Sequence, residues 1–277
     1  MAELVGGFVI PHVPLIASNA DAPPPAQRAN VMNAFATVAG RLRELEVDTV
    51  IVIGSEHCSL FGSECLPPCF IGIGDIQGPM EEWLGIARKD LAGHPQLARH
   101  IVDHGMDNGI DWSVARNLTV DHAIMIPHHF VVGHVPGARI IPIYLNAGVA
   151  PAIRAPRAAR IGASIAQAIA SWPGPERVAI LGTGGLSHWV GMAQMGAVNA
   201  DWDRSIIALI EAGDLDSLIA MSDPAIEAAA GNGALEIKNH ICAMAALPGA
   251  RGRLIAYEAV TEWICGCGFL ELVPPPT

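Results

Sequence analysis

Three short apolar runs, each followed by a histidine, constrain the fold of this chain more than any other feature of its sequence. Each run has the length and composition of a buried β-strand. The runs and the histidines beyond them are 4–10 with His12, 49–53 with His57, and 177–181 with His188. Because side chains beyond the carboxyl ends of neighbouring strands meet in one crevice of an open α/β sheet, we expect the three imidazoles to lie close together. Such a cluster is typical of a metal site or of acid–base catalysis.

The rest of the sequence alternates between helix-like and strand-like segments. Helices are expected at about 28–45, 80–104 with a break at 93–95, 156–171, 202–212, 214–221 and 234–246, and further strands at 69–73, 139–145, 254–260 and 269–273. This alternation favours one continuous unit, and the 277 residues, 51% of them hydrophobic, are enough to bury a large core. We therefore predict an α/β fold, with a three-layer α/β/α core around a mostly parallel or mixed sheet, in a single domain over residues 1–277.

Individual residues add detail to this fold. The strand, helix and strand that end at Ile53 predict a βαβ unit with a parallel pair and a right-handed crossover. Pro142 indicates that the strand 139–145 is bulged or lies at an edge. Asp214 is expected to cap the helix that follows it, and Gly231-Asn232-Gly233 to be a flexible hinge.

Charge and composition exclude several classes of function. A formal net charge of -11 argues against nucleic-acid binding, which requires basic side chains to neutralise phosphates. No apolar run approaches the ~20 residues of a membrane-spanning helix, and residues 1–3 lack the basic start of a signal peptide. We therefore expect a cytoplasmic protein with neither nucleic acid nor membrane as a partner. The six cysteines form no CxxC pair, so buried, reduced thiols are expected rather than a structural zinc site.

Glu236 is the residue that would complete a specific metal site with two of the histidines. Two neutral imidazoles and a carboxylate on one face of an octahedral ion leave three positions open, as in non-haem Fe(II) oxygenases. The alternative is that Glu236 is an exposed helix residue that contacts Asn239 or His240, three or four positions later. Spacing alone does not decide between these two interpretations.

Other motifs are less specific. His122, in the segment Val120-Asp121-His122, and the pair His128-His129 are each compatible with a structural role, because eleven histidines cannot all be catalytic. The glycines of segment 182–185 lack the ending of a P-loop, and we expect them to let the chain turn and present the histidine beyond them. The segment Gly54-Ser55-Glu56-His57 departs from the GxSxG elbow of serine hydrolases.

Five segments, taken together and in this order, resemble those of the class III extradiol ring-cleavage dioxygenases, in particular the catalytic β subunits of protocatechuate 4,5-dioxygenases. The resemblance extends from residue 12 to about residue 246. The segments are Pro11-His12-Val13-Pro14, Gly54-Ser55-Glu56-His57, Val120-Asp121-His122, Gly184-Gly185-Leu186-Ser187-His188 and Ala234-Leu235-Glu236-Ile237-Lys238-Asn239.

The resemblance implies a role for each candidate residue. It implies that His12, His57 and Glu236 hold Fe(II), the only cofactor. It also implies that His188 is the acid–base histidine near the substrate hydroxyl and O2, and that His122 is a second active-site histidine. The implied activity inserts both atoms of O2 into a catecholic ring and opens the ring next to the diol.

The resemblance also implies partners. The substrate would be a small aromatic ring such as protocatechuate, gallate, or a related aminophenol or dihydroxypyridine, consumed together with O2. Some relatives use a small α subunit to cover the active site, so we expect either such a partner or a homo-oligomer. Glu262 would repel a ring carboxylate if it faces the ligand, although a solvent-facing position is equally compatible with the sequence.

Two other functions stay compatible with the residues. A zinc-dependent hydrolase could use the same ligands, since tetrahedral zinc also accepts two histidines, a carboxylate and water. A noncatalytic scaffold could share the fold, but it would need neither His122 nor His188.

Overall fold

Continuous apolar runs form the centre of a mixed nine-stranded sheet. In the computed structural model, which describes residues 1–62 and 64–275, the strands follow the spatial order β4-β3-β6-β2-β7-β1-β9-β8, and β5 pairs with β3. Their bounds are β1 Glu3–Ile10, β2 Thr49–Ser55, β3 Cys69–Gly78, β4 Lys89–Leu91, β5 Ser113–Thr119, β6 Arg139–Leu145, β7 Arg177–Thr183, β8 Arg251–Val260 and β9 Cys265–Val273. The strands β6, β2, β7 and β1 are parallel, and every residue of β2 is buried, as expected where helices cover both faces.

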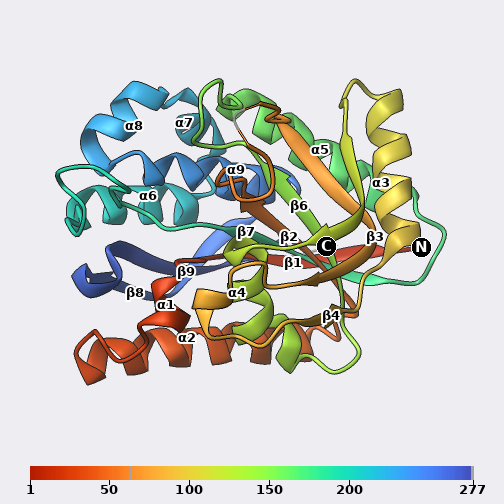
Figure 1. Cartoon of the computed structure of the whole chain (residues 1–277). Coiled ribbons are helices and arrows are strands. Elements are labelled where there is room, and N and C mark those ends of the chain that lie inside the picture. The colour runs from red at the N-terminus through yellow and green to blue at the C-terminus, as the bar shows by residue number, and fades with distance from the viewer. Residues whose placement is uncertain (63, 276–277) are drawn as a thin grey trace.

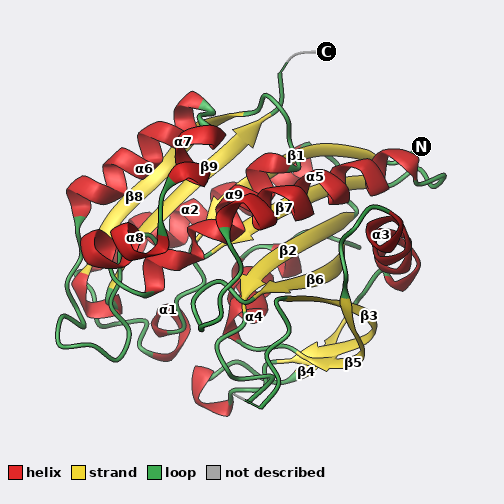
Figure 2. Cartoon of the chain, turned by 90° about the horizontal axis from the view of Figure 1, so that it is seen from above, coloured by secondary structure: helices red, strands yellow, loops and turns green. Residues whose placement is uncertain are grey.

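Helices cover both faces of this sheet (Figure 1). One face carries α1 Leu15–Ser18, α2 Pro25–Glu44 and α4 His122–Phe130, and the other carries α3 Pro95–Asp107, α5 Ala155–Ser171, α6 Ala200–Ala212, α7 Leu215–Ala220, α8 Asp223–Ala230 and α9 Ile237–Ala245. Figure 2 shows α5 and α9 lying over the central strands. Buried apolar side chains form two clusters, one on each face of the sheet. The predicted three-layer α/β/α fold is therefore confirmed.

The predicted βαβ unit contains an inserted strand. β1, α2 and β2 follow one another along the chain and the two strands are parallel, but β7 lies between them and pairs with both. The prediction of parallel strands is confirmed, while their adjacency is not. As a consequence, the carboxyl ends of the three strands that precede His12, His57 and His188 lie next to one another.

Residues 80–94 are not helical, so this part of the sequence prediction is wrong. A single 3-10 turn, η1 (Glu82–Leu84), is followed by Gly85 with a φ of 71° and by the edge strand β4, which pairs antiparallel with β3. The helix α3 begins only at Pro95, whose missing N–H needs no partner in a first helical turn. The local periodicity could not reveal β4 because its backbone partners are in β3.

Pro142 lies in an interior strand, neither at an edge nor at a bulge. β6 runs between β3 and β2, but its pairing with β3 stops at Ile143, so no residue pair with β3 involves Pro142. Asp214 caps α7 as predicted, since its carboxylate accepts from the N–H of Ser217. The elements α1, α4 and β5 were not predicted, and Leu118 is the one buried residue of β5.

The structure also tests the expectations for the cysteines and for membrane-spanning helices. Cys69, Cys242, Cys265 and Cys267 are buried free thiols, as expected, whereas Cys58 and Cys65 are free but exposed. Within the described part of the chain, no helix has the length and apolar character needed to cross a membrane.

His128 is a buried histidine of α4 with no hydrogen-bond partner for its Nδ1 atom among the described residues. Burial, helped by the charge of Lys89, lowers the pKa of this imidazole from 6.5 to about 4. An unfolded chain takes up the proton at a higher pH than the folded chain does. The contribution of His128 to folding stability is therefore lost as the pH falls from about 6.5 to about 4.

Replacing His128 by Leu should remove most of this acid sensitivity. Between pH 7 and pH 5, we expect the free energy of unfolding of the wild type to fall by about 2 kcal/mol more than that of His128→Leu. Only the wild type has an imidazole at position 128, which takes up a proton more readily in the unfolded chain than in the folded chain. Urea unfolding at both pH values measures this difference, with the exposed His134→Leu as the matched control. Equal losses in the wild type and His128→Leu would contradict the assignment.

Candidate active site

The active-site candidates gather at the carboxyl edge of the sheet, where β2, β7 and β1 end side by side. The His12 and His57 rings meet edge to face with their centroids 5.2 Å apart. His122, at the start of α4, stacks on His57 at 4.4 Å and lies 5.8 Å from His12. Glu236 is the last residue of the 3-10 turn η3 (Gly233–Glu236) that leads into α9. Residues from four distant parts of the chain therefore converge here, and the strand-end rule predicted this for His12 and His57.

Glu236 is buried between the two histidines, with only 6% of its surface exposed. Its Oε1 atom lies 2.8 Å from His12 Nε2 and 3.0 Å from His57 Nε2. Its Oε2 atom accepts the backbone N–H of Gly185 at 2.9 Å. The interpretation of Glu236 as an exposed helix residue is therefore wrong.

The glycine-rich turn after β7 makes room for this carboxylate. A Cβ atom on Gly184 would lie 2.6 Å from Glu236 Cβ and 2.8 Å from its Oε2, and the φ of Gly184 is 152°. Only glycine fits such a position without displacing Glu236. Asn239, one turn further along α9, donates to Ser55 Oγ and to the carbonyl of Thr183, which ties α9 to the ends of β2 and β7.

Hydrogen bonds fix which nitrogen of each imidazole carries the proton. Thr183 Oγ1 donates to the carbonyl of Ile53 at 2.9 Å, so it accepts from His12 Nδ1–H at 2.8 Å. Likewise His57 Nδ1 lies 3.2 Å from Asp121 Oδ2, and a carboxylate can only accept. In the neutral forms of both rings, the Nε2 lone pair therefore points at Glu236 Oε1.

This donor set fits a divalent cation. His12 Nε2 and His57 Nε2 each lie within 3.0 Å of the same carboxylate oxygen, and in the neutral rings these lone pairs repel that oxygen unless a positive charge lies among them. Burial is the largest single effect on the pKa of His57 and lowers it, but hydrogen bonds to Asp121 and Glu236 outweigh burial and raise this pKa to about 10. The neighbouring His12 also helps to hold the pKa of Glu236 well below its usual range, despite burial. Two imidazoles and one carboxylate are the typical ligands of mononuclear non-haem iron.

A third imidazole lies beside this set. Ligand atoms of His12, His57 and His122 all lie within 4.8 Å of one another. His122 Nδ1 is 2.6 Å from Glu81 Oε1, and Glu81 Oε2 is buried without a hydrogen-bond partner among the described residues. Glu81 therefore holds the ring of His122 in place, and its second carboxylate oxygen is buried without a partner among the described residues.

His188 completes the group from the other side of Glu236. Its Nδ1–H donates to the carbonyl of Leu186 at 3.0 Å, so in the neutral ring Nε2 is the free base, 3.7 Å from Glu236 Oε2. A Cβ atom on Gly233 would lie 2.1 Å from His188 Nε2. The segment predicted as a hinge is therefore a packing surface against this imidazole, because Gly231 and Gly233 both lie against His188.

One cavity of about 430 Å³ opens onto all five candidate residues: His12, His57, His122, His188 and Glu236. A smaller cavity of about 230 Å³ adjoins it and shares His57, His188, Val190 and Glu236. Glu262 lines neither cavity. Its side chain is exposed and accepts from Thr261 Oγ1, and the residue of this segment that reaches the larger cavity is Ile264.

Sequence reasoning missed the residues that orient the histidines. Thr183 ends β7 at the same edge as the histidines, so the strand-end rule could have included it. Asp121 both caps α4, by accepting from Ala123 N–H, and accepts from Tyr144 O–H, and its place before a helix start was a usable signal. No local pattern points to Glu81, which reaches the site from the segment between β3 and η1.

Comparisons with known proteins give one family and a set of relatives. Residues 6–268 match the family described as "Catalytic LigB subunit of aromatic ring-opening dioxygenase". Similar proteins named 2,3-dihydroxyphenylpropionate/2,3-dihydroxicinnamic acid 1,2-dioxygenase include one from Comamonas testosteroni, 27% identical over 94% of this chain and 94% of the relative. The corresponding protein of Xanthobacter autotrophicus is 26% identical over 95% and 97%, and that of Klebsiella pneumoniae is 25% identical over 87% and 90%.

A solved structure shares the fold. The crystal structure of the uncharacterized protein JW3007 from Escherichia coli K12 superposes with a TM-score of 0.54, covering 97% of this chain and 99% of that one. At 9% sequence identity, this likeness supports the architecture alone.

The hydrogen bond from His12 to Thr183 should control metal affinity. Thr183→Val removes the acceptor for His12 Nδ1–H at nearly constant volume, so we expect divalent metal affinity to fall by about 10- to 100-fold. Thr183→Ser keeps the oxygen and should keep the affinity. Anaerobic competition titration of Fe(II) against a chelator measures both, with thermal melts to verify folding. Equal affinities for the wild type and the valine variant would show that Thr183 does not act on the metal through His12.

Proposed function

The chain belongs to the family of catalytic LigB subunits of aromatic ring-opening dioxygenases, and on this premise we propose that it is an Fe(II)-dependent extradiol enzyme acting on a catecholic ring. Family membership makes it a ring-cleavage dioxygenase, so the hydrolase and scaffold alternatives are not retained. The observation that carries the proposal is the pair of Nε2 lone pairs directed at one carboxylate oxygen of Glu236, next to the free Nε2 of His188.

We assign His12, His57 and Glu236 as the metal ligands. These side chains would hold Fe(II), which would supply a Lewis acid for two adjacent oxygens of the substrate and redox chemistry toward O2. Thr183 and Asp121 keep the two imidazoles in the tautomer that exposes Nε2 to a cation. Gly185 N–H holds the second oxygen of Glu236, which leaves Oε1 for the metal side.

His188 is assigned as the acid–base residue. Its Nε2 can accept the proton of a substrate hydroxyl, and the carbonyl of Leu186 stabilises the resulting imidazolium through Nδ1–H. The same nitrogen can return the proton later in the reaction. His122 is assigned as the second active-site histidine, and Glu81 fixes the ring against His57. Both assignments place proton-transfer groups on the rim of the 430 Å³ cavity.

For the substrate and the protein partner, we propose a chemical class and a kind of partner rather than one specific molecule. Relatives named for 2,3-dihydroxyphenylpropionate support a substituted catechol as substrate, consumed with O2. We take residues 1–277 as one catalytic domain. A small α subunit or a second copy of the chain are the two candidates for a protein partner.

Substituting His188 and Glu236 separates catalysis from metal binding. His188→Ala should retain bound iron but lose about 10²- to 10⁴-fold in turnover, because it removes only the base. Glu236→Ala should lose the iron itself. Metal content and O2 uptake, with spectra of the ring-opened product, are measured on protein loaded anaerobically with Fe(II), using the exposed His129→Ala as the control.

The catechol panel for this experiment includes catechol, protocatechuate, gallate, aminophenol and 2,3-dihydroxyphenylpropionate. Stoichiometric O2 uptake with a new chromophore is the expected result. Full activity in a folded, iron-loaded His188→Ala protein would contradict the assignment of His188 as the acid–base residue. The absence of uptake with every ring, in protein that holds one iron per chain, would overturn the proposed function.

A further inference from the structure

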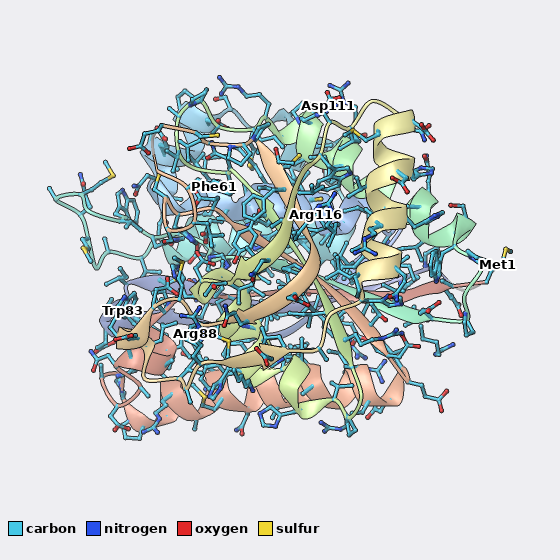
Figure 3. All side chains as sticks on the ribbon, turned by 45° about the vertical axis from the view of Figure 1, so that its right-hand side comes forward. Met1, Phe61, Trp83, Arg88, Asp111 and Arg116 are labelled. Atoms are coloured by element: carbon cyan, nitrogen blue, oxygen red, sulfur yellow. The ribbon has the colours of Figure 1, made fainter. Side chains whose placement is uncertain are left out.

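The outer wall of the active-site cavity is apolar. Trp83, Val190 and Met195 line the cavity, yet they are 57%, 50% and 55% exposed. Figure 3 shows Trp83 at the periphery of the molecule. Large apolar side chains that remain exposed beside a polar centre are typical of a surface that a ligand covers.

These side chains come from separate segments that meet only at this site. Trp83 belongs to η1, Val190 and Met195 to the loop between β7 and α6, and Ile264 to the turn between β8 and β9. Ile264 has a φ of 55°, a left-handed conformation that a β-branched residue rarely adopts. Backbone strain of this kind clusters at ligand-binding sites, where the surrounding structure holds it.

The described lining of both cavities holds carboxylates but no long basic side chain that could pair with an anionic substituent. Among the described residues that line them, the ionisable groups are histidines and the carboxylates of Glu56, Glu81 and Glu236, with no lysine or arginine. Glu56 already accepts three backbone N–H groups of the loop that follows it. Glu81 has a buried oxygen without a partner, so a substrate carboxylate nearby would face a like charge.

The basic residues closest in sequence to the cavity walls have other partners. Arg88, near Trp83 along the chain, donates to Gln77 Oε1 and Thr119 Oγ1. Lys238, two residues after Glu236, is buried and donates to the carbonyl of Ala147 and to Asp223. Neither residue lines the active-site cavities.

The imidazoles are also committed to partners. Glu81 holds Nδ1 of His122, and the carbonyl of Leu186 takes the Nδ1–H of His188. A substrate carboxylate could therefore reach only the Nε2 atoms of these rings, and in neutral His188 that atom is a lone-pair base that would repel it. An alkyl or aryl group would instead cover apolar surface that is exposed to water.

We propose that the substrate is a catechol whose ring substituent is uncharged and apolar, an alkyl or aryl group seated against Trp83, Val190, Met195 and Ile264. This inference rests on the proposed function. It differs from the substrate for which the similar proteins are named, because 2,3-dihydroxyphenylpropionate carries a carboxylate. A cavity of about 430 Å³ falls within the range that holds ligands larger than one unsubstituted ring.

The test compares two substrates of nearly equal size that differ in charge. Protein loaded with Fe(II) is offered 3-propylcatechol, 2,3-dihydroxyphenylpropionate and catechol, and both the anaerobic Kd and kcat/KM are measured. We expect 3-propylcatechol to be favoured over the propionate by on the order of 100-fold in both quantities. Equal or better binding and turnover of the propionate would overturn the inference while the proposed function stands.

Variants of the apolar wall test whether its side chains contact the ring substituent. Trp83→Ala and Met195→Ala should each weaken binding of 3-propylcatechol by about tenfold more than they weaken binding of catechol, because the propyl group is the part that is seated against them. Val190→Lys should reduce the preference for 3-propylcatechol over 2,3-dihydroxyphenylpropionate, because the added cation attracts the carboxylate. Met106→Ala, an exposed methionine of α3 that does not line the cavity, is the matched control for Met195→Ala.

The two proposals fail in different ways. No O2 uptake with any catechol would overturn the proposed function, while the anaerobic Kd values would still decide the preference for an apolar substituent. Uptake with catechol and the propionate but not with 3-propylcatechol would overturn the inference alone. Unchanged affinity for 3-propylcatechol in Trp83→Ala and Met195→Ala would also overturn it, because the apolar wall would then make no contact with the substituent.

Discussion

A buried carboxylate between two imidazole lone pairs is the constraint on which the rest of the site depends. Removing Glu236 from water costs free energy that its neighbours must offset. The backbone N–H of Gly185 satisfies one oxygen, and His12 and His57 meet the other. Gly184 lies where a side chain would occupy the space of this carboxylate. The hydrogen bonds of Asn239 to two strand ends fix the helix that follows Glu236.

The histidines divide into two groups by what holds their Nδ1 atoms. His12 donates to a hydroxyl at the end of β7 and His57 to a carboxylate at the start of α4, so their Nε2 atoms converge on one point. His188 donates to a backbone carbonyl in its own turn, so its Nε2 has no partner within the turn. The two roles proposed for these histidines therefore follow from the hydrogen-bond partner at the far side of each ring.

The sequence predicted the placement of the site better than its details. The carboxyl ends of parallel strands lie at one edge of the sheet, independently of the loop conformations. The convergence of His12, His57 and His188 could therefore be predicted from the apolar runs that form these strands. The residue that decides the character of the site, Glu236, was ambiguous because burial depends on a glycine turn about 50 positions earlier in the chain. Residues 80–94 were misassigned for a similar reason, since β4 exists only through pairing with β3. Glu81 belongs to that same misassigned stretch, and no local signal could bring it to His122.

The histidines with Glu236 and the apolar wall of the cavity come from different kinds of segment. This difference explains how an enzyme can retain its reaction while its substrate changes. The proposed metal ligands lie just beyond strand ends and in the turn that leads into α9, which is tied to those strand ends, so moving any one of them would disturb the sheet. The apolar wall comes from loops and single turns that pair with nothing in the core, and its residues can change without cost to that sheet. At 25–27% identity, relatives can share the first part and differ in the second. Substrate preference should therefore be read from Trp83, Val190, Met195 and Ile264 of this chain, and the reaction from the histidines and Glu236.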